Sequence, residues 1–460
     1  MNIKESIRKY MEEAIGHENA LVAFSAFDEP ASTAVRYNPF KKCVKMDGKD
    51  VMWSDHGLIL PERPVFTLDP LFHAGAYYVQ DSSSMFVGYA FRRMLAQLQL
   101  PQGRPLRVLD LCAAPGGKTT DLAASLREAC GDGFLLVANE VMKARVGILA
   151  DNVALWGDPN VVVTSDDPVA FGSLPGFFDV IVTDVPCSGE GMFRKDEEAV
   201  AQWSEDNVAL CEGRQRRILA DVWPSLREGG VLIYSTCTFN RMENDGNVEW
   251  IASELGAEIL TSDDVLGGMN GVLKTQHGYS LVPGHVEGEG QYCAALRRTA
   301  SDSMSDMPVR SKKPARPTKP APIPDGLLRL MNVPVVFRTK GDMITAVPAG
   351  IAADVSRVEE SLHVVAAGCA VGVVKGKDLV PDADLALTLM LAHDAYPSVD
   401  VDRQTALAFL HRDAVTFPDS PKGYLLLRHE GLPIGFVKNL GNRCNSLHPQ
   451  SRRIRMDINR

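Results

Sequence analysis

Short runs of β-branched and other apolar residues alternate with longer amphipathic segments between residues 105 and 298. Apolar runs of about four to eight residues predict strands, whereas apolar residues that recur at helical spacing predict helices. The predicted strands are 108–112, 134–140, 161–164, 178–184 and 231–237, and the predicted helices are 118–129, 143–156 and 206–226. This alternation favours an α/β fold, a doubly wound parallel sheet between two layers of helices.

Smaller units precede and follow this core. Residues 1–95 have the mixed pattern of a small α+β segment, and the core itself takes residues 96–300. Residues 301–325 are rich in Pro, Ser and Lys and hold almost no large apolar side chains. That composition is typical of an extended, solvated linker.

Two more units are predicted after the linker. The first, residues 326–395, is a middle α+β domain with expected strands at 333–337, 343–347 and 364–374 and a helical stretch at 382–393. The second, residues 396–460, has an expected helix at 403–410 and strands at 424–428 and 433–438. Glycines punctuate these last strands, which favours a β-barrel-like unit.

Composition and charge narrow the class of protein. The 460 residues are 45% hydrophobic and 23% charged. No apolar run approaches the roughly 18 residues that span a bilayer, and Met1 to Tyr10 do not resemble a signal peptide. We therefore expect a cytosolic protein that does not enter the membrane. The net charge of −10 argues against a protein coated with nucleic acid, but six basic residues cluster in 438–460 against one acid, Asp457.

The nine cysteines are odd in number and never form a Cys-x-x-Cys pair. This spacing indicates neither a disulfide framework nor a structural zinc site, so we expect reduced thiols and no bound metal.

Acidic residues end the predicted strands at the edge where open parallel sheets bind ligands. The first strand ends at Asp110 and runs into Ala113-Ala-Pro-Gly-Gly117, where small residues let backbone amides approach a ligand. Glu140 ends the second strand and can accept hydrogen bonds from both ribose hydroxyls of a nucleoside. Asp166 and Asp167 follow the third strand, and one of them can accept a hydrogen bond from an adenine amino group. Asp184 ends the fourth strand. Helix caps without a ligand are the alternative for each acid, but the set favours a nucleoside cofactor.

A phosphate-binding loop is a competing interpretation. Gly117-Lys-Thr119 matches the end of such a loop, and 178–184 matches the apolar strand with an Asp that holds magnesium. The first glycine of that motif would fall at Cys112, however, and Pro115 removes an amide donor. Both departures disfavour it.

Two cysteines lie at strand ends on this same edge, Cys187 just after 178–184 and Cys237 at the end of 231–237. A single cysteine is most often a buried core residue, but two at a cofactor edge favour chemistry. Carbon 5 of a pyrimidine becomes nucleophilic when a thiolate adds to carbon 6, and a second group is needed for release. Asp184 is the natural hydrogen-bond partner for ring nitrogen 3. Lys118 either tunes Asp184 or is a solvated residue opening a helix.

These segments resemble the signature motifs of the Sun family of RNA cytosine-5 methyltransferases. The matching motifs are Asp110-x-Cys-Ala-Ala-Pro-Gly-Gly-Lys-Thr, Asp184-x-Pro-Cys-Ser-Gly-x-Gly, and Ser235-Thr-Cys-Thr followed by Glu243-Asn244. The resemblance covers roughly residues 1–298 and implies a Rossmann-like domain that uses S-adenosyl-L-methionine. It also implies that Cys237 is the nucleophile, whereas DNA cytosine methyltransferases attack with the Pro-Cys cysteine. Cys187 would then assist release of the methylated base.

The resemblance assigns site residues position by position. Catalytic roles fall on Cys237, Cys187, Asp184 and Lys118. The implied cofactor contacts are Cys112, Ala113, Ala114, Pro115, Gly116, Gly117, Lys118, Glu140, Asp167 and Asp184. Asp167 precedes a proline where many relatives have alanine, which leaves open whether Asp166 or Asp167 faces adenine.

Both ends of the chain also resemble RNA-modifying enzymes. Arg36-Tyr-Asn-Pro39 and the segment from His73 to Met85 are similar to the N-terminal part of the family. Asn439 to Arg443 and Leu447 to Ile454 are similar to the PUA-like unit of bacterial RsmF-type enzymes, which modify small-subunit ribosomal RNA. The resemblance implies RNA-binding units at 1–95 and 396–460. It also implies a partner that is small-subunit ribosomal RNA or an assembling subunit, and neither DNA nor a membrane.

Several candidate RNA contacts keep two interpretations. Tyr77 and Tyr78 either stack on a base or pack in the core. Arg194 and Lys195 either contact the target strand or are solvated. The basic segment 438–460 either binds phosphates or forms a solvated tail. An extruded or single-stranded cytosine is the expected substrate, because ring carbons are inaccessible in a duplex. We expect a monomer. The alternative function is a ribosome-assembly factor that binds RNA and whose methylation is lost or incidental.

Overall fold

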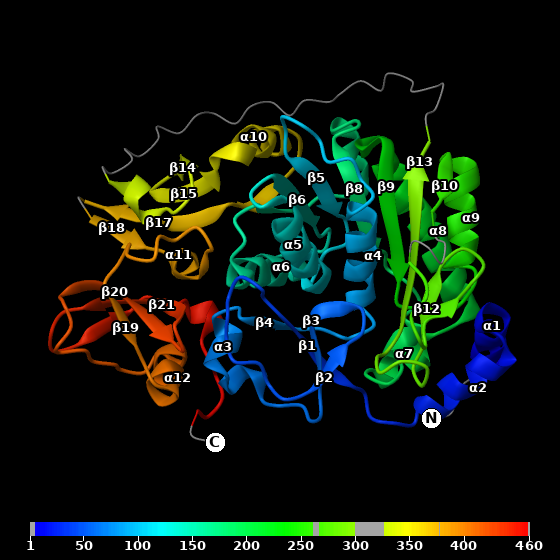
Figure 1. Cartoon of the computed structure of the whole chain (residues 1–460), viewed down its shortest axis with the longest axis horizontal. Coiled ribbons are helices and arrows are strands. Elements are labelled where there is room, and N and C mark those ends of the chain that lie inside the picture. The colour runs from blue at the N-terminus through cyan, green and yellow to red at the C-terminus, as the bar shows by residue number, and fades with distance from the viewer. Residues whose placement is uncertain (1–4, 261–265, 300–325, 377, 459–460) are drawn as a thin grey trace.

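A ten-stranded sheet forms the centre of the molecule in the computed structural model, which describes residues 5–260, 266–299, 326–376 and 378–458 (Figure 1). Its strand order is β11-β12-β13-β9-β8-β5-β6-β7-β16, with β10 paired to β13. The five parallel strands are β5 (Leu106–Asp110), β6 (Phe134–Asn139), β7 (Val161–Thr164), β8 (Phe178–Asp184) and β9 (Leu226–Thr236). They match the predicted strands closely, because each is a nearly continuous apolar run buried on both faces.

Antiparallel strands complete the sheet at both edges. Beside β9 lie β13 (Gln291–Arg298), β12 (Tyr279–Leu281), β11 (Leu273–Lys274) and β10 (Ala257–Ile259), and beside β7 lies β16 (Val364–Ala367). The predicted linker, 301–325, falls outside the described residues.

Helices cover both faces of the sheet, so the α/β fold prediction is confirmed. One apolar core lies under α4 (Met85–Leu95), α5 (Gly117–Cys130) and α6 (Lys143–Trp156). The other lies under α8 (Glu205–Val222), α9 (Asp245–Glu254) and α10 (Ala352–Ser361). The helix predicted to reach residue 226 ends at Val222, because Pro224 in the following short turn has no amide hydrogen to continue it.

The N-terminal unit packs against the edge where the parallel strands end. Its sheet has the order β2-β3-β1-β4, with β1 (Thr33–Tyr37), β2 (Lys49–Val51), β3 (Ser54–Leu60) and β4 (Tyr77–Val79), and α3 (Pro70–His73) precedes the last strand. The first two helices, α1 (Glu5–Ile15) and α2 (His17–Ala26), share an apolar cluster with Phe193, Trp203 and Phe239 near α7 (Glu197–Gln202). This unit therefore contacts the segments that follow both candidate cysteines.

The middle unit differs from its prediction at one strand. The expected strand 364–374 is two strands that separate at Gly368, whose φ of +65° is a conformation that glycine tolerates best. The first half, β16, joins the central sheet, and the second, β17 (Cys369–Lys375), joins β14 (Val335–Lys340), β15 (Met343–Pro348) and β18 (Asp378–Pro381).

The helical stretch expected at 382–393 is also shorter. It ends after α11 (Ala383–Leu387), because the next residues turn to bind α6. The Leu389 amide donates to the Gly157 carbonyl at 2.9 Å, and the Thr388 hydroxyl donates to the same oxygen at 3.3 Å.

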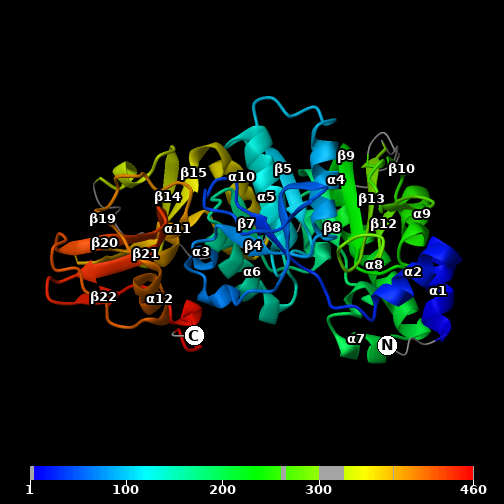
Figure 2. The same ribbon diagram turned by 60° about the horizontal axis from the view of Figure 1, so that its bottom comes forward.

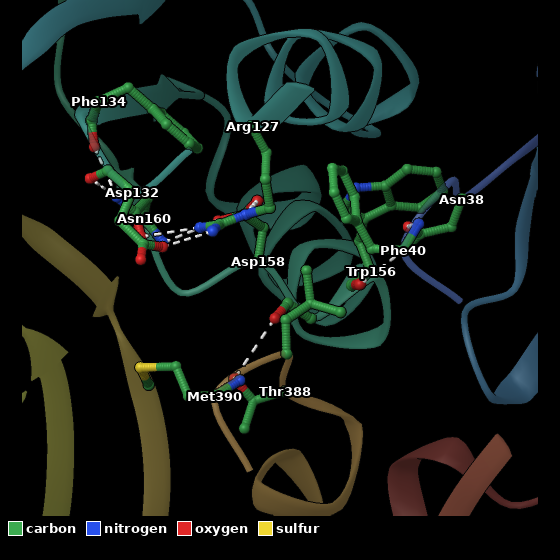
Figure 3. A network of polar contacts seen from close by, with 12 residues as sticks. Asn38, Phe40, Arg127, Asp132, Phe134, Trp156, Asp158, Asn160, Thr388 and Met390 are labelled. Atoms are coloured by element: carbon green, nitrogen blue, oxygen red, sulfur yellow. Dashed lines mark hydrogen bonds and ion pairs between the residues drawn. The ribbon is translucent and has the colours of Figure 1, made fainter. Parts of the chain in front are cut away.

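Figure 3 shows how three units meet around the end of α6. From the N-terminal unit, the Asn38 amide donates to the Trp156 carbonyl at 3.0 Å. Nearby, Arg127 pairs with Asp158 at 2.6 Å and fixes the loop that leads into β7.

The C-terminal unit is a sheet of order β19-β20-β21-β22 with one helix. Its elements are β19 (Ser398–Asp400), α12 (Arg403–His411), β20 (Gly423–His429), β21 (Leu432–Asn439) and β22 (Cys444–Ser446). Both views place it beside α3 and the middle unit, at the opposite end of the molecule from α1 and α2 (Figures 1 and 2). Across the described part of the chain, we find no helix with the length and apolar character that crossing a membrane requires.

Candidate active site

Four of the predicted catalytic side chains lie together where β8 and β9 end. The Lys118 ammonium, at the start of α5, donates to Asp184 Oδ2 at 2.8 Å. The other carboxylate oxygen accepts hydrogen bonds from Ser235 Oγ at 3.1 Å and Gln291 Nε2 at 3.2 Å. Burial by itself would lower the pKa of Lys118, but its attraction to Asp184 outweighs burial and the pKa is raised. Lys118 is therefore a partner of Asp184 and not a solvated residue.

The two cysteine thiols are in direct contact. Cys187 Sγ lies 3.1 Å from Cys237 Sγ, and all nine cysteines are free. The strands that precede them, β8 and β9, are adjacent and parallel, and the Val185 amide donates to the Ser235 carbonyl at 3.1 Å. The pKa of Cys187 is raised well above that of an ordinary thiol, mainly by the hydrogen bond with Cys237 and secondly by burial. Cys187 therefore keeps its proton at neutral pH.

The glycine turn after β5 is held by α6. Gly116 has a φ of +115°, and α5 begins at the next residue. The Ala114 carbonyl accepts a hydrogen bond from Arg145 at 2.6 Å, and the Pro115 carbonyl accepts one from Asn152 at 2.8 Å. These bonds occupy two carbonyls of the turn and hold it against α6.

One buried acid at this edge has an oxygen without a protein partner. Asp110 Oδ2 accepts a hydrogen bond from Thr119 at 2.6 Å, whereas Oδ1 is buried and has no partner among the described residues. Burial raises the pKa of Asp110 to about 7. Because Asp110 shares the edge with Glu140, Asp184 and Lys118, its free oxygen suits an ammonium or hydroxyl group of a bound ligand.

The acids of the next two strands differ in their surroundings. Glu140 is buried, and its carboxylate accepts a hydrogen bond from the Met142 amide at 2.8 Å and faces Arg145 at 3.4 Å. Asp166 accepts a hydrogen bond from the His363 amide at 2.7 Å, so the approach to β16 occupies it. Asp167 accepts a hydrogen bond from the Val169 amide at 3.3 Å and pairs with Arg217 at 3.3 Å, but 43% of its side chain stays exposed.

Cys112 lies at the start of the turn, and its side chain is partly buried. Its side chain packs against the apolar cluster under α8, and burial raises the pKa of its thiol. The cofactor contacts predicted for Cys112, Ala113 and the following turn residues would therefore be made mainly by backbone atoms. These contacts stay a prediction.

Several candidate RNA contacts are used inside the protein instead. Arg194 forms an ion pair with Glu289 at 2.7 Å, with only 6% of its side chain exposed, and Lys195 pairs with Asp81 at 3.0 Å. Tyr77 is buried and donates to Asp69 at 2.6 Å. For Tyr77 the core-packing interpretation is confirmed, whereas Arg194 is not solvated as the alternative expected but is buried in an ion pair.

The basic C-terminal segment also loses one member to an internal role. Arg452 pairs with Asp384 at 2.6 Å and with Asp151 at 2.9 Å. It thereby joins the C-terminal unit to α11 and α6. Among the described residues, no group of three or more His, Cys, Asp or Glu side chains is arranged to hold a metal ion.

Sequence reasoning missed a buried polar cluster beneath the cysteines. Glu190 and Glu243 are both 0% exposed and bind backbone amides of the cysteine segments. Acidic residues in loops usually lie at the surface, and Glu190 falls on an unspecified position of its motif, so nothing in the sequence pointed to it. Glu243 is named in the motif after Cys237, but its burial and partners were not predicted.

Family models match three parts of the chain. The model described as 16S rRNA methyltransferase RsmB/F matches residues 97–297, that for the N-terminal domain of 16S rRNA methyltransferase RsmF matches 3–82, and that for the methyltransferase RsmF PUA domain matches 396–454.

Curated relatives match the chain in part. The ribosomal RNA small subunit methyltransferase F of Klebsiella pneumoniae (strain 342) is 38% identical over 231 residues, which are 50% of this chain and 46% of that one. The protein of the same description from Escherichia coli O157:H7 is 37% identical over 229 residues, 49% of this chain and 46% of that one. The alignment thus spans about half the length of these relatives.

Solved structures share the fold. A methyltransferase homologue from Pyrococcus horikoshii has a TM-score of 0.50 and 26% identity, covering 63% of this chain and 93% of that one. NSun6 from Pyrococcus horikoshii with SFG has a TM-score of 0.52 and 18% identity, covering 65% and 99%. At that identity the second likeness shows the fold alone.

Proposed function

We propose, from the premise that this chain belongs to the RsmB/F family of methyltransferases, that it makes 5-methylcytosine in RNA with S-adenosyl-L-methionine as methyl donor. The observation that carries the cytosine-5 chemistry is the contact of the two thiols, 3.1 Å apart at the ends of adjacent parallel strands. A pyrimidine carbon 5 needs both a nucleophile at carbon 6 and a group that permits release.

In the proposed reaction Cys237 adds to cytosine carbon 6, and its sulfur forms a covalent bond there. Carbon 5 then takes the methyl group from the sulfonium, and a water molecule removes the carbon-5 proton. The bond between sulfur and carbon 6 breaks, which restores the ring and releases Cys237 as the thiolate that adds in the next turnover. Cys187 stays protonated beside Cys237 and assists this release by donating a hydrogen bond to the departing sulfur. Asp184, oriented by Lys118, Ser235 and Gln291, binds the ring at nitrogen 3 and stabilises the adduct.

The acidic edge of the sheet fits the methyl donor. Bound there, S-adenosyl-L-methionine supplies an electrophilic methyl group on a sulfonium. The turn 112–117 and Lys118 would lie against it, Glu140 would accept its ribose hydroxyls, Asp167 would face its adenine, and Asp184 would approach its polar end. The unpartnered oxygen of Asp110 supports a polar ligand at this place.

The substrate we propose is small-subunit ribosomal RNA, free or in an assembling subunit, bound by a cytoplasmic monomer. The matches of 3–82 and 396–454 to RsmF domains support RNA binding by the two end units. Both units lie on one side of the molecule with α7, toward the carboxyl ends of the parallel strands (Figure 1).

Transfer of a labelled methyl group to ribosomal RNA tests the proposal. Cys237→Ala should abolish transfer, and Cys187→Ala should accumulate a covalent complex of protein and RNA that survives denaturing electrophoresis. Cys130→Ala, at the far end of α5, is the matched control and should retain activity. Normal transfer by Cys237→Ala rules the mechanism out, and RNA binding without any methyl transfer by the unaltered protein would instead favour an assembly factor.

A further inference from the structure

Two buried carboxylates cross-connect the segments that carry the thiols. Glu190 follows Cys187 by three residues, and Glu243 follows Cys237 by six. Both side chains are fully buried at the base of the site, and neither is one of the residues assigned to the reaction.

Glu190 binds the segment of the other cysteine. Its Oε2 accepts hydrogen bonds from the backbone amides of Phe239 at 2.7 Å and Asn240 at 3.0 Å. Its Oε1 accepts bonds from Trp203 Nε1 at 2.9 Å and Asn240 Nδ2 at 3.0 Å. Both oxygens of this carboxylate are therefore surrounded by donors, which offsets the cost of burying a charge.

Glu243 makes the reciprocal connection. Its Oε2 accepts hydrogen bonds from the Ser188 amide at 3.1 Å and from Gln215 Nε2 at 2.7 Å, and its Oε1 accepts one from Asn240 Nδ2 at 2.8 Å. Ser188 directly follows Cys187. The hydroxyls of Ser188 and Thr238, each next to a cysteine, are 2.9 Å apart.

We propose that Glu190 and Glu243 are positioning residues that form a crossed clamp, each carboxylate gripping the segment of the opposite cysteine, so that the two thiols stay in contact. The catalytic consequence rests on the proposed function, whereas the clamp itself is a property of the protein alone. Each glutamate acts through a cysteine segment and not on the substrate, because hydrogen bonds to protein donors occupy both of its oxygens.

The clamp requires carboxylates and not merely polar side chains. A glutamine at either position has nearly the same shape but replaces one oxygen by an amino group. Because donors surround both oxygens, this amino group faces another donor in either orientation. Glu190→Gln and Glu243→Gln therefore break the clamp with little change in volume.

Oxidative cross-linking measures the clamp directly. Diamide accepts two electrons and two protons from two thiols, so that a disulfide forms and the diazene becomes a hydrazine. The sulfurs need to approach by only about 1 Å to reach the disulfide distance. Peptide mapping by mass spectrometry follows the Cys187–Cys237 cross-link without RNA or activity. The reaction is run above pH 7, where the Glu243 carboxyl is ionised.

We expect each glutamine variant to cross-link about ten- to a hundredfold more slowly than the unaltered protein, the factor for one lost hydrogen bond to a buried charge. Turnover should fall similarly while the KM for RNA stays within about twofold. Glu254→Gln, exposed at the end of α9, is the matched control and should cross-link at the normal rate.

Thermal unfolding and S-adenosyl-L-methionine binding identify the variants that are folded. Glu190→Gln and Glu243→Gln break the clamp from opposite sides. Unchanged cross-linking in a folded glutamine variant overturns the clamp. Slow cross-linking with no methyl transfer by the unaltered protein leaves the clamp standing and overturns the proposed function. Should both variants unfold, Asn240→Asp, which removes the amide donor to both carboxylates, must slow the cross-link or the clamp is refuted.

Discussion

Replacing Arg36 by methionine tests how the N-terminal unit is fastened to the turn that precedes α5. Arg36 is 1% exposed. Its guanidinium donates to Gln80 Oε1 at 2.9 Å, to the Gly117 carbonyl at 3.1 Å and to Thr120 Oγ1 at 2.6 Å. Methionine has a similar length but no donors, so the variant leaves these buried acceptors without a partner from β1.

The cost can be estimated from the buried ion pair that is lost. Arg36 also faces Asp121 at 3.6 Å, and removing one member of a buried pair costs about 3–5 kcal/mol. Asp121 keeps its pair with Arg92 at 3.1 Å, so we expect the lower end, about 3 kcal/mol. Unfolding 460 residues at about 2.1 cal/mol/K per residue corresponds to about 1 kcal/mol per degree, so Tm should fall by about 3 °C.

Scanning calorimetry measures this shift, and titration calorimetry measures the affinity for S-adenosyl-L-methionine. We expect the affinity to fall as well, because Arg36 holds the first carbonyl of α5. Arg63→Met, an exposed arginine over Phe66 in the same unit, is the control and should shift Tm by less than about 1 °C. If Arg36→Met behaves like this control in both measurements, buried hydrogen bonds do not fasten the two units and the reasoning fails.

Three further outcomes follow from single contacts. Lys118→Met removes the cation that pairs with Asp184, so the rate of methyl transfer should fall about ten- to a hundredfold. A single-turnover assay measures this rate, and an unchanged rate would contradict the role of the ion pair. Arg452→Met should lower Tm by about 1–3 °C because two ion pairs between units are lost, whereas exposed Arg455→Met should leave Tm unchanged. Burial raises the pKa of Glu243 from 4.5 to about 7, so the folded state holds a proton that the unfolded state releases, and the unaltered protein loses up to about 3 kcal/mol of stability between pH 4.5 and 7. Glu243→Gln lacks this loss, so its Tm relative to the unaltered protein should rise over that pH range, and a flat difference would refute the assignment.

The sequence by itself determined the architecture of the core and the chemistry at its edge. Strands such as β6 and β7 are buried on both faces, so their apolar runs are readable without knowing their neighbours. Parallel strands end at one edge, so the chain order already indicated that Asp184, Cys187 and Cys237 would meet there. The family resemblance supplied their roles but not their geometry.

Only the tertiary structure decided which polar residues work inside the protein. Arg36, Arg194 and Glu190 look like surface residues in a local pattern, yet each is buried because its partners come from segments far away in the chain. The division of 364–374 between two sheets likewise depends on the exposed edge of β7, which no local pattern describes. Hydrophobic periodicity records the environment of a residue along its own element, whereas the pairing of buried charges depends on distances across the folded chain.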